Sequence, residues 1–295
     1  MNLQDRAKEY LEYCTYRKEL DAKTVKAYRI DLTQFFSYVQ STEPEKETIE
    51  QYITELHKKY KQKTIKRKIA SIKAFYSYLE GEELVEQNPF RKIKVKFKET
   101  IILPRIIPRE EIEQLLNYIY ASLSSLSGIQ YKHSLRDAAV IEVFFATGAR
   151  VYEISNIRVE NINLNSGLIR IMGKGRKERY IQISNTAVLD ILRKYYEENE
   201  PEIKKSGYFF INNRGKRYTE QSIRLMLKKY TLKAGIQRKI TPHMFRHSFA
   251  TYLIEEGVDV SCVQQILGHS SIKTTQIYIH VAAKKQADIL RELHP

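Results

Sequence analysis

Residues 241–278, TPHMFRHSFATYLIEEGVDVSCVQQILGHSSIKTTQIY, carry the most informative pattern in this chain. Thr241 and Pro242 predict a helix start, because a Thr side chain caps free backbone N–H groups and Pro needs no N–H at the first helical position. His243 and Arg246 are three residues apart, so they share one face of that helix near its positively polarised end. Such a position attracts phosphate groups.

A second, shorter helix is predicted over residues 260–267, ending at Gly268 directly before His269. Tyr278 follows nine residues later. The pKa of a free tyrosine is about 10, so a nucleophilic Tyr278 requires a base that accepts its proton and cations that neutralise its target. Because the chain contains 21 Tyr, one tyrosine alone indicates little, and a histidine near a helix start is more often structural than catalytic.

The ordered motifs H-x-x-R-H-S-F-A-T, L-G-H and T-T-Q-I-Y resemble the C-terminal half of the tyrosine recombinase (phage integrase) family, closest to the bacterial Xer-type site-specific recombinases. The resemblance implies an enzyme that cleaves and rejoins DNA strands through a 3′-phosphotyrosyl intermediate. It implies no metal ion, no ATP and no other cofactor. Dimer resolution of the Xer kind and integration or excision of mobile elements use the same residues, and both tasks stay open.

Two upstream motifs extend the resemblance. A-T-G-A-R-V-Y-E-I, residues 146–154, is similar to the first arginine box of the family, in which the Arg faces the scissile phosphate and the Glu orients it. From spacing alone, Arg150 and Glu153 also fit a simple pair within one helix. The catalytic residues that the resemblance implies are Arg150, Lys174, His243, Arg246, His269 and Tyr278.

GLIRIMGKGRKERYIQIS, residues 167–184, has the alternation and Gly-rich turn of a β-hairpin, with Lys174 in the turn. The family resemblance makes this lysine a catalytic acid. A nucleotide-binding P-loop is excluded because G-x-x-x-x-G-K-[ST] is absent. We expect Arg176, Lys177 and Arg179 to be DNA-backbone contacts or solvated charges.

The composition indicates a globular protein that binds a polyanion. The net charge is +15 with 42% hydrophobic residues, and no apolar run is long enough to span a membrane. The N-terminus lacks the order of a signal peptide, and two distant Cys read as reduced thiols, so we expect a cytoplasmic protein. His243 and His247 have the spacing of a zinc site, but the Glu of HExxH is missing, and we expect no metal.

Residues 1–80 show helical periodicity of apolar residues, and residues 58–73, KKYKQKTIKRKIASIK, carry many cations and no acid. A surface helix usually mixes signs, so this stretch predicts a helix that contacts DNA phosphates. The predicted DNA-binding residues are Lys63, Lys66, Arg67, Lys68, Arg176 and Lys177. A polar loop is expected at 122–133, after a helix at 109–120.

We therefore expect a mainly α fold with a small antiparallel β-sheet, forming a C-shaped clamp around DNA. A helical, SAM-like core-binding domain spans residues 1–95, a linker 96–108, and an α+β catalytic domain 109–295. Its tail helix, residues 282–293, is expected to dock on a neighbouring copy, giving a tetramer on two double-stranded DNA sites. Whether a second recombinase or an accessory protein takes part stays open. The alternative is a non-catalytic DNA-binding or architectural protein, which explains the charge but not the ordered motifs.

Overall fold

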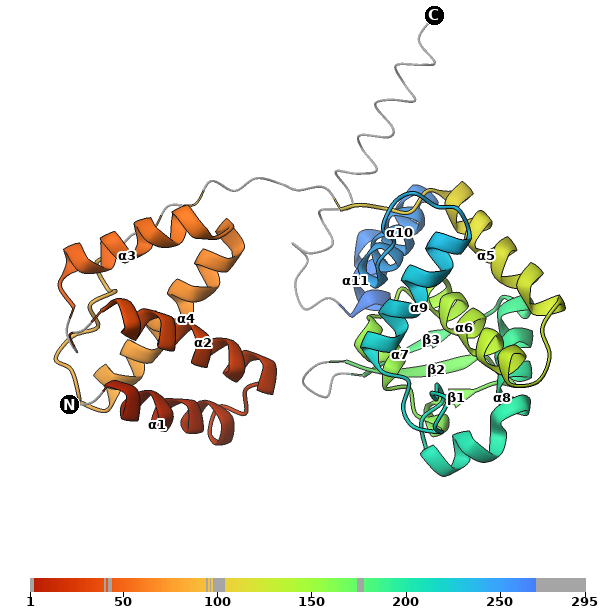
Figure 1. Ribbon diagram of the computed structural model, residues 1–295, viewed down its shortest axis with the longest axis horizontal. Coiled ribbons are helices and arrows are strands. Elements are labelled where there is room, and N and C mark those ends of the chain that lie inside the picture. The colour runs from red at the N-terminus through yellow and green to blue at the C-terminus, as the bar shows by residue number, and fades with distance from the viewer. Residues whose placement is uncertain are drawn as a thin grey trace, which may run out of the picture. The chain divides into compact units, whose positions relative to one another are not determined.

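The chain divides into two compact units, Met1–Thr100 (the N-terminal unit) and Ile101–Pro295 (the C-terminal unit). The computed structural model describes residues 3–39, 41, 44–93, 95, 97, 104–173 and 178–268. Most of the described chain is helical, with one small sheet, as the sequence predicts (Figure 1).

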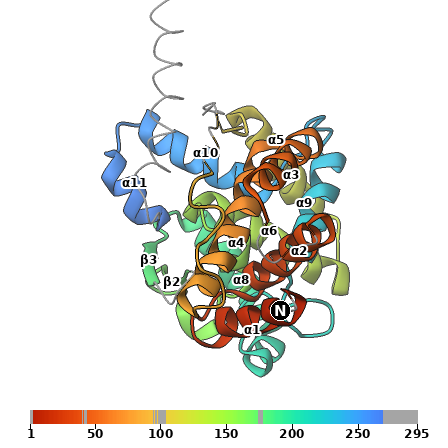
Figure 2. The same cartoon turned by 90° about the vertical axis from the view of Figure 1, so that its left-hand side faces the viewer.

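The N-terminal unit is built from four helices (Figure 2). They are α1 (Leu3–Tyr16), α2 (Ala22–Tyr38), α3 (Lys46–Lys59) and α4 (Gln62–Gly81). Asp21 caps α2, because its carboxylate accepts from the backbone N–H of Lys23 at 2.8 Å. The basic stretch 58–73 is not one helix, because α3 ends at Lys59 and α4 begins at Gln62.

Aromatic side chains fill the core of this unit. Phe35 of α2 lies edge-on to Tyr76 of α4 with ring centroids 6.1 Å apart, and Phe75 packs against Tyr10 of α1 at 5.5 Å. All four are buried. Such contacts join three helices through large apolar areas, which is the main stabilising term in a unit of this size.

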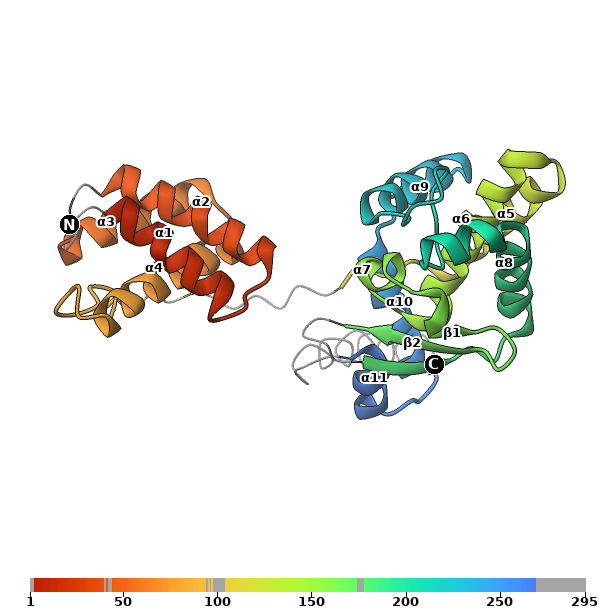
Figure 3. The same cartoon turned by 90° about the horizontal axis from the view of Figure 1, so that it is seen from below.

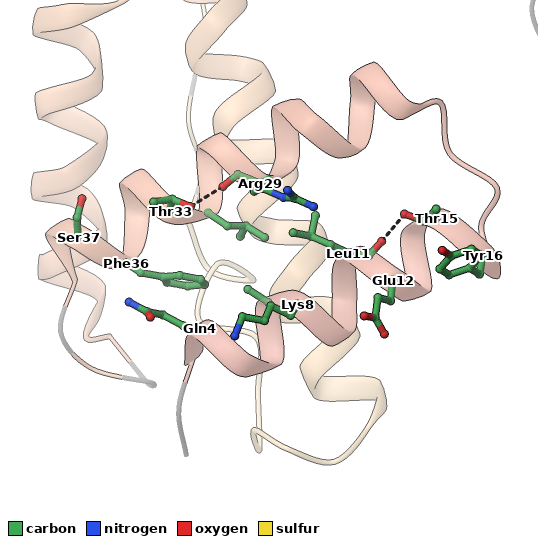
Figure 4. Close-up of a pocket in the computed structure, with 12 residues that line it drawn as sticks. Gln4, Lys8, Leu11, Glu12, Thr15, Tyr16, Arg29, Thr33, Phe36 and Ser37 are labelled. Carbon is green, nitrogen blue, oxygen red and sulfur yellow. Dashed lines mark hydrogen bonds between the residues drawn. The ribbon is translucent and has the colours of Figure 1, made fainter.

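A groove of about 870 Å³ lies between α1 and α2 (Figure 4). Its floor contains Leu11, Leu32 and Phe36. The hydroxyl groups of Thr15 and Thr33 on its walls donate to carbonyl oxygens of their own helices, at 2.7 and 2.9 Å. None of the predicted catalytic residues lines this groove, so its volume does not make it a candidate active site.

The C-terminal unit is organised around α6, which is packed by α5, α8 and α10 (Figure 1). Its elements are α5 (Arg109–Ser124), α6 (Gly128–Thr147), α7 (Val151–Ser155), the 3₁₀ helix η1 (Val159–Asn161), β1 (Ile162–Asn163), β2 (Leu168–Met172), β3 (Glu178–Gln182), α8 (Thr186–Ser206), α9 (Glu220–Lys233), α10 (Pro242–Glu255) and α11 (Val260–Leu267). From Leu135 to Phe144 every residue of α6 is buried, as expected for a central helix.

The predicted hairpin is present as β2 and β3, which pair antiparallel with Ile169 opposite Ile181. A third short strand, β1, pairs with β2 and was not predicted. The sheet order is β1-β2-β3, and α11 lies beside β3 (Figure 3). The hairpin turn, residues 174–177, lies outside the described residues.

The expected polar loop at 122–133 is wrong, because α5 continues to Ser124 and α6 begins at Gly128. Serine hydroxyls in this region donate to carbonyl oxygens one turn back, as Ser122 does to Ile119 at 2.7 Å. That bond satisfies the hydroxyl inside a helix, so a serine-rich composition does not force a loop here. Thr241 is the N-cap residue of α10, but its side chain makes no capping hydrogen bond.

Candidate active site

The first part of the site is the junction between α6 and α7. Gly148 ends α6 with φ +56°, a conformation that strains residues with a side chain. A Cβ atom there would also lie 2.5 Å from Cδ1 of Phe249, on α10. Both the turn and the close approach of α10 therefore require glycine. The turn places Arg150 as the N-cap residue of α7.

Glu153 holds Arg150 in place from within α7. Its Oε2 accepts from the backbone N–H of Arg150 at 2.7 Å, and its Oε1 accepts from Nη1 of the same residue at 2.9 Å. Glu153 is only 3% exposed, whereas the side chain of Arg150 is 39% exposed. The pair expected from spacing is thus present, and the carboxylate fixes an arginine that remains partly open to solvent.

A second arginine binds the same carboxylate. Arg179, on β3, donates from Nη1 to Oε1 of Glu153 at 3.0 Å and from Nη2 to Oε2 at 2.8 Å. Its side chain is 11% exposed. The expectation that Arg179 is a DNA-backbone contact or a solvated charge is therefore wrong.

Strand alternation could have found this arginine. On β3, Arg179 and Ile181 lie on the inner face, while Tyr180 between them is exposed. An arginine in register with a buried isoleucine requires a buried acid, since a charge is costly to bury unpaired. Glu153 supplies that acid.

Burial of Glu153 by itself would raise its pKa. The hydrogen bonds and charge of Arg179, with those of Arg150, act in the opposite direction and outweigh it. The pKa of Glu153 consequently lies below its usual value, and the carboxylate is ionised at neutral pH.

Arg246 joins three segments of the unit. It lies on α10, is 4% exposed, and donates from Nη1 to the carbonyl oxygen of Gly148 at 3.0 Å and from Nη2 to that of Leu267 at 2.7 Å. These acceptors are the ends of α6 and α11. Both are neutral, so the bonds hold the guanidinium in place without cancelling its charge.

The two histidines of α10 differ in environment. His243 is exposed, and His247 is half-buried. Burial, with smaller contributions from the charges of His243 and Arg246, lowers the pKa of His247 to about 4. His247 is therefore neutral at pH 7, which suits a packing role.

The described chain ends at Gly268, which closes α11 with φ +63° as predicted. A Cβ atom at Gly268 would lie 3.3 Å from Cδ and Nη1 of Arg179. The turn before His269 therefore rests against the arginine of β3. The remaining predicted residues, Lys174, Arg176, Lys177, His269 and Tyr278, lie outside the described residues.

The predicted DNA-binding residues of α4 fall into two groups. Lys63 and Lys66 are exposed, and Lys66 Nζ lies 5.0 Å from the ring centroid of Phe97. The prediction that Lys68 contacts DNA is wrong, because this lysine is 2% exposed and donates to Asp31 at 3.0 Å. Arg67 also pairs with the buried Asp31, but its side chain remains partly exposed.

The sequence of residues 58–73 does not reveal this network, because the stretch itself contains no acid. Asp31 lies on α2, at the same helix interface as Lys68. On the exposed side, Glu55 of α3 pairs with Lys58 at 2.7 Å and with Lys59 at 3.3 Å. Acids from neighbouring turns and helices thus neutralise part of the basic stretch.

The described residues contain neither a metal-binding cluster of side chains nor a membrane-spanning helix. No three His, Cys, Asp or Glu side chains there are grouped so as to hold a metal ion. No helix of that part of the chain has the length and apolar character needed to cross a membrane.

Comparison with known proteins agrees with the resemblance that the motifs carry. Residues 105–285 match the phage integrase family, and residues 7–83 match the phage integrase N-terminal SAM-like domain. The chain belongs to the phage integrase family and is an enzyme of site-specific DNA recombination. Nothing in these matches favours the non-catalytic alternative.

The similarity extends over most of the length of the relatives. A tyrosine recombinase of Agathobacter rectalis is 48% identical over 100% of this chain and 97% of its own. Tyrosine recombinase XerD of Listeria innocua is 34% identical over 99% of each chain. The crystal structure of the XerH site-specific recombinase bound to palindromic difH substrate, a post-cleavage complex, matches the fold with a TM-score of 0.77 and 22% identity, over 96% of this chain and 84% of that one.

Proposed function

We propose that this recombinase cleaves DNA by attack of Tyr278 on a phosphodiester whose non-bridging oxygens are held by Arg150 and Arg246. The observation that carries the proposal is the pair of hydrogen bonds from Arg246 to the ends of α6 and α11. These bonds hold Gly148, two residues before Arg150, and Leu267, the last residue of α11, against α10. Residues more than a hundred positions apart are thereby drawn to one place.

The electrostatics support a phosphate at this place. Arg150 and Arg179 share one carboxylate, that of the buried Glu153, and Arg246 binds the carbonyl oxygen of Gly148, two residues before Arg150; among these described groups, positive charge is in excess. The planar guanidinium fork matches two phosphate oxygens better than an ammonium does. A preorganised donor aimed at developing charge is worth roughly 3–4 kcal/mol of barrier.

In the proposed step, the hydroxyl oxygen of Tyr278 forms a new bond to phosphorus while the bond to the 5′ oxygen of the next nucleotide breaks. His243 accepts the tyrosine proton, and Lys174 gives a proton to the departing 5′ oxygen. His269 adds a hydrogen bond to the phosphate. The 3′-phosphotyrosyl ester keeps the energy of the original diester, so attack by a 5′ hydroxyl of another strand completes the exchange without ATP.

A nicked suicide duplex tests the chemistry, with its site taken from genomic fragments that the protein retains. Wild type should form a covalent protein–DNA adduct seen on a denaturing gel. Tyr278→Phe should bind the duplex and form none, and Tyr16→Phe, an exposed tyrosine of α1, should behave as wild type. An adduct in Tyr278→Phe would remove this residue from the role.

The DNA substrate is proposed to lie between residues 1–95 and residues 109–295, with 96–108 as linker, in the cytoplasm. Lys63, Lys66, Arg67, Arg176 and Lys177 are the proposed phosphate contacts. The logarithm of the affinity falls as the logarithm of the salt concentration rises, and removing one contact should make this dependence less steep by about 0.9. A Lys63→Ala variant with an unchanged slope would exclude that residue.

We also propose that copies join through their tails as a tetramer on two sites. A groove of about 360 Å³ on α5, α6 and α10, lined by Phe145, Phe249 and Leu253, is the proposed acceptor for residues 282–293 of a second copy. Its apolar lining suits the apolar face of an amphipathic tail. Deleting 282–295 should leave single-site binding intact and abolish the four-copy complex on native gels; an unchanged complex would exclude the tail.

The biological task is proposed to be resolution of chromosome dimers or movement of a mobile element. The similarity to a XerD protein supports the first. Sequencing the DNA that the protein retains from its own genome distinguishes them, because a single chromosomal site indicates dimer resolution and element ends indicate mobility. Reactions with and without cell extract show whether a second recombinase or accessory protein is needed.

A further inference from the structure

Arg179 is absent from the residues to which the family pattern assigns a role, yet it is built into the site. It supplies two of the four hydrogen bonds that reach the carboxylate of Glu153, and Arg150 supplies the other two. Each carboxylate oxygen receives one bond from each arginine. The carboxylate is therefore shared symmetrically, and neither arginine can move without disturbing the bonds of the other.

Among the described residues, the hydrogen bonds of the Arg179 guanidinium are the two to Glu153. Its Nε is buried and has no hydrogen-bond partner among the residues that the structure describes. An unpaired buried donor costs about 1–3 kcal/mol. The two parallel bonds to the two oxygens of Glu153 therefore set the orientation of the guanidinium within the described part of the unit.

Arg179 also contacts the end of α11. Its Cδ and Nη1 would lie 3.3 Å from a Cβ atom at Gly268, so the glycine lets the backbone turn pass close to the guanidinium. Through this contact, β3 touches the turn that leads into His269. Arg179 therefore contacts both Glu153, which holds Arg150, and Gly268, the last residue that the structure describes.

We propose that Arg179 is a positioning residue for DNA strand cleavage: its two bonds fix Glu153 so that Arg150 is presented to the phosphate, and its packing against Gly268 fixes the end of α11. The inference rests on the proposed function, because it requires a phosphate at Arg150. Arg179 itself contacts no reacting atom in this account.

A lysine cannot replace this arginine fully. The guanidinium places two parallel donors on the two oxygens of one carboxylate, whereas an ammonium group is a point charge that reaches one oxygen well. Arg179→Lys should therefore keep the charge but loosen the geometry. Arg179→Met removes both and leaves Arg150 as the only cation facing Glu153 from the described elements.

The test is single-turnover cleavage of the nicked suicide duplex at saturating protein. Relative to wild type, we expect Arg179→Met to cleave about 10- to 100-fold more slowly, as misplacing a reacting group by about 1 Å does. The cleavage rate of Arg179→Lys should lie between the rates of wild type and Arg179→Met. The dissociation constant for the duplex should change less than about threefold in both. Arg170→Met, on the adjacent strand β2 with its guanidinium on Asn161 at 2.6 Å, is the matched control and should cleave at the wild-type rate.

Two readouts separate positioning from a loss of stability. Without Arg179, burial should raise the pKa of Glu153, because only Arg150 among the described groups still opposes it. The cleavage rate of Arg179→Met should then increase with pH over a range where wild type is flat. Glu153→Gln should slow cleavage similarly, and the double variant should be no slower than the slower single variant.

The outcomes distinguish this inference from the proposed function. If wild type forms the adduct and Arg179→Met cleaves at the wild-type rate, Arg179 has no positioning role, while the proposed function stands. Additive effects of Arg179→Met and Glu153→Gln on the cleavage rate would also overturn the positioning role of Arg179. If wild type forms no adduct, both proposals fall. If circular dichroism shows that Arg179→Met does not fold, Arg179→Lys takes its place. Its cleavage rate is then compared with that of the double variant Arg179→Lys with Glu153→Gln.

Discussion

The guanidinium of Arg246 donates to the carbonyl oxygen of Gly148, 98 residues earlier in the chain, at a distance of 3.0 Å. The same side chain donates to the carbonyl of Leu267 at 2.7 Å. Arg246 therefore holds the ends of two helices against α10, and under the proposed function its guanidinium also binds the phosphate. These functions can be separated by experiment, because one affects stability and the other affects cleavage.

Replacing Arg246 should destabilise the C-terminal unit. Arg246→Ala leaves the buried carbonyl groups of Gly148 and Leu267 without this donor, and we expect the free energy of unfolding to fall by about 2–4 kcal/mol. Urea denaturation measures it. Arg224→Ala, which removes an exposed pair with Glu220 at 3.1 Å, should cost less than about 0.5 kcal/mol. Equal losses in the two variants would contradict the tethering role.

Gly148 is limited by space as well as by conformation. Gly148→Ala should destabilise the protein by about 2–4 kcal/mol, because the left-handed φ costs about 1 kcal/mol and a Cβ 2.5 Å from Phe249 adds the cost of overpacking. Gly128→Ala is the matched control, since Gly128 has the same φ of +56° and nothing within 4 Å of the added atom. Thermal unfolding compares them; equally stable variants would mean that the contact with Phe249 relaxes freely.

Lys68 should act on stability rather than on DNA. Lys68→Ala leaves the fully buried Asp31 with Arg67 and Ser71 as its partners, and we expect the unfolding free energy to fall by about 2–4 kcal/mol. The salt slope of DNA binding should stay at the wild-type value below the unfolding temperature. Lys63→Ala should do the reverse, changing the slope and not the stability. A lowered slope with normal stability in Lys68→Ala would restore it as a phosphate contact.

Stability should depend on pH through His247. Its pKa is lowered to about 4 by burial first and by nearby positive charge second, whereas an unfolded histidine has a pKa of about 6.5. The folded state binds this proton less readily, so its contribution to stability is complete above pH 6.5 and is lost as the pH falls toward 4. The melting temperature at pH 7.5 minus that at pH 5 should therefore be smaller in His247→Gln than in wild type. His57→Gln, on α3, should leave the difference unchanged; an undiminished difference in His247→Gln would show that another group titrates.

Local patterns predicted several elements correctly because their causes are local. Alternating residues and a Gly-rich turn predicted β2 and β3, and Gly268 predicted the end of α11. The loop expected at 122–133 was wrong, because a serine hydroxyl can be satisfied either in a loop or within a helix. Ser122 is satisfied within α5, where it donates to a carbonyl oxygen one turn back.

The sequence alone determined the fold class, the family and the identity of the residues with a proposed catalytic role, because these follow from periodicity and from the order of motifs along the chain. Only the tertiary structure decided which charges pair across elements, whereas the Arg150–Glu153 pair followed from local spacing. Arg179 meets Glu153 and Lys68 meets Asp31 across elements far apart in sequence. The physical reason is that a buried charge takes its partner from whichever element packs against it, and a pattern within one segment holds no information about that partner.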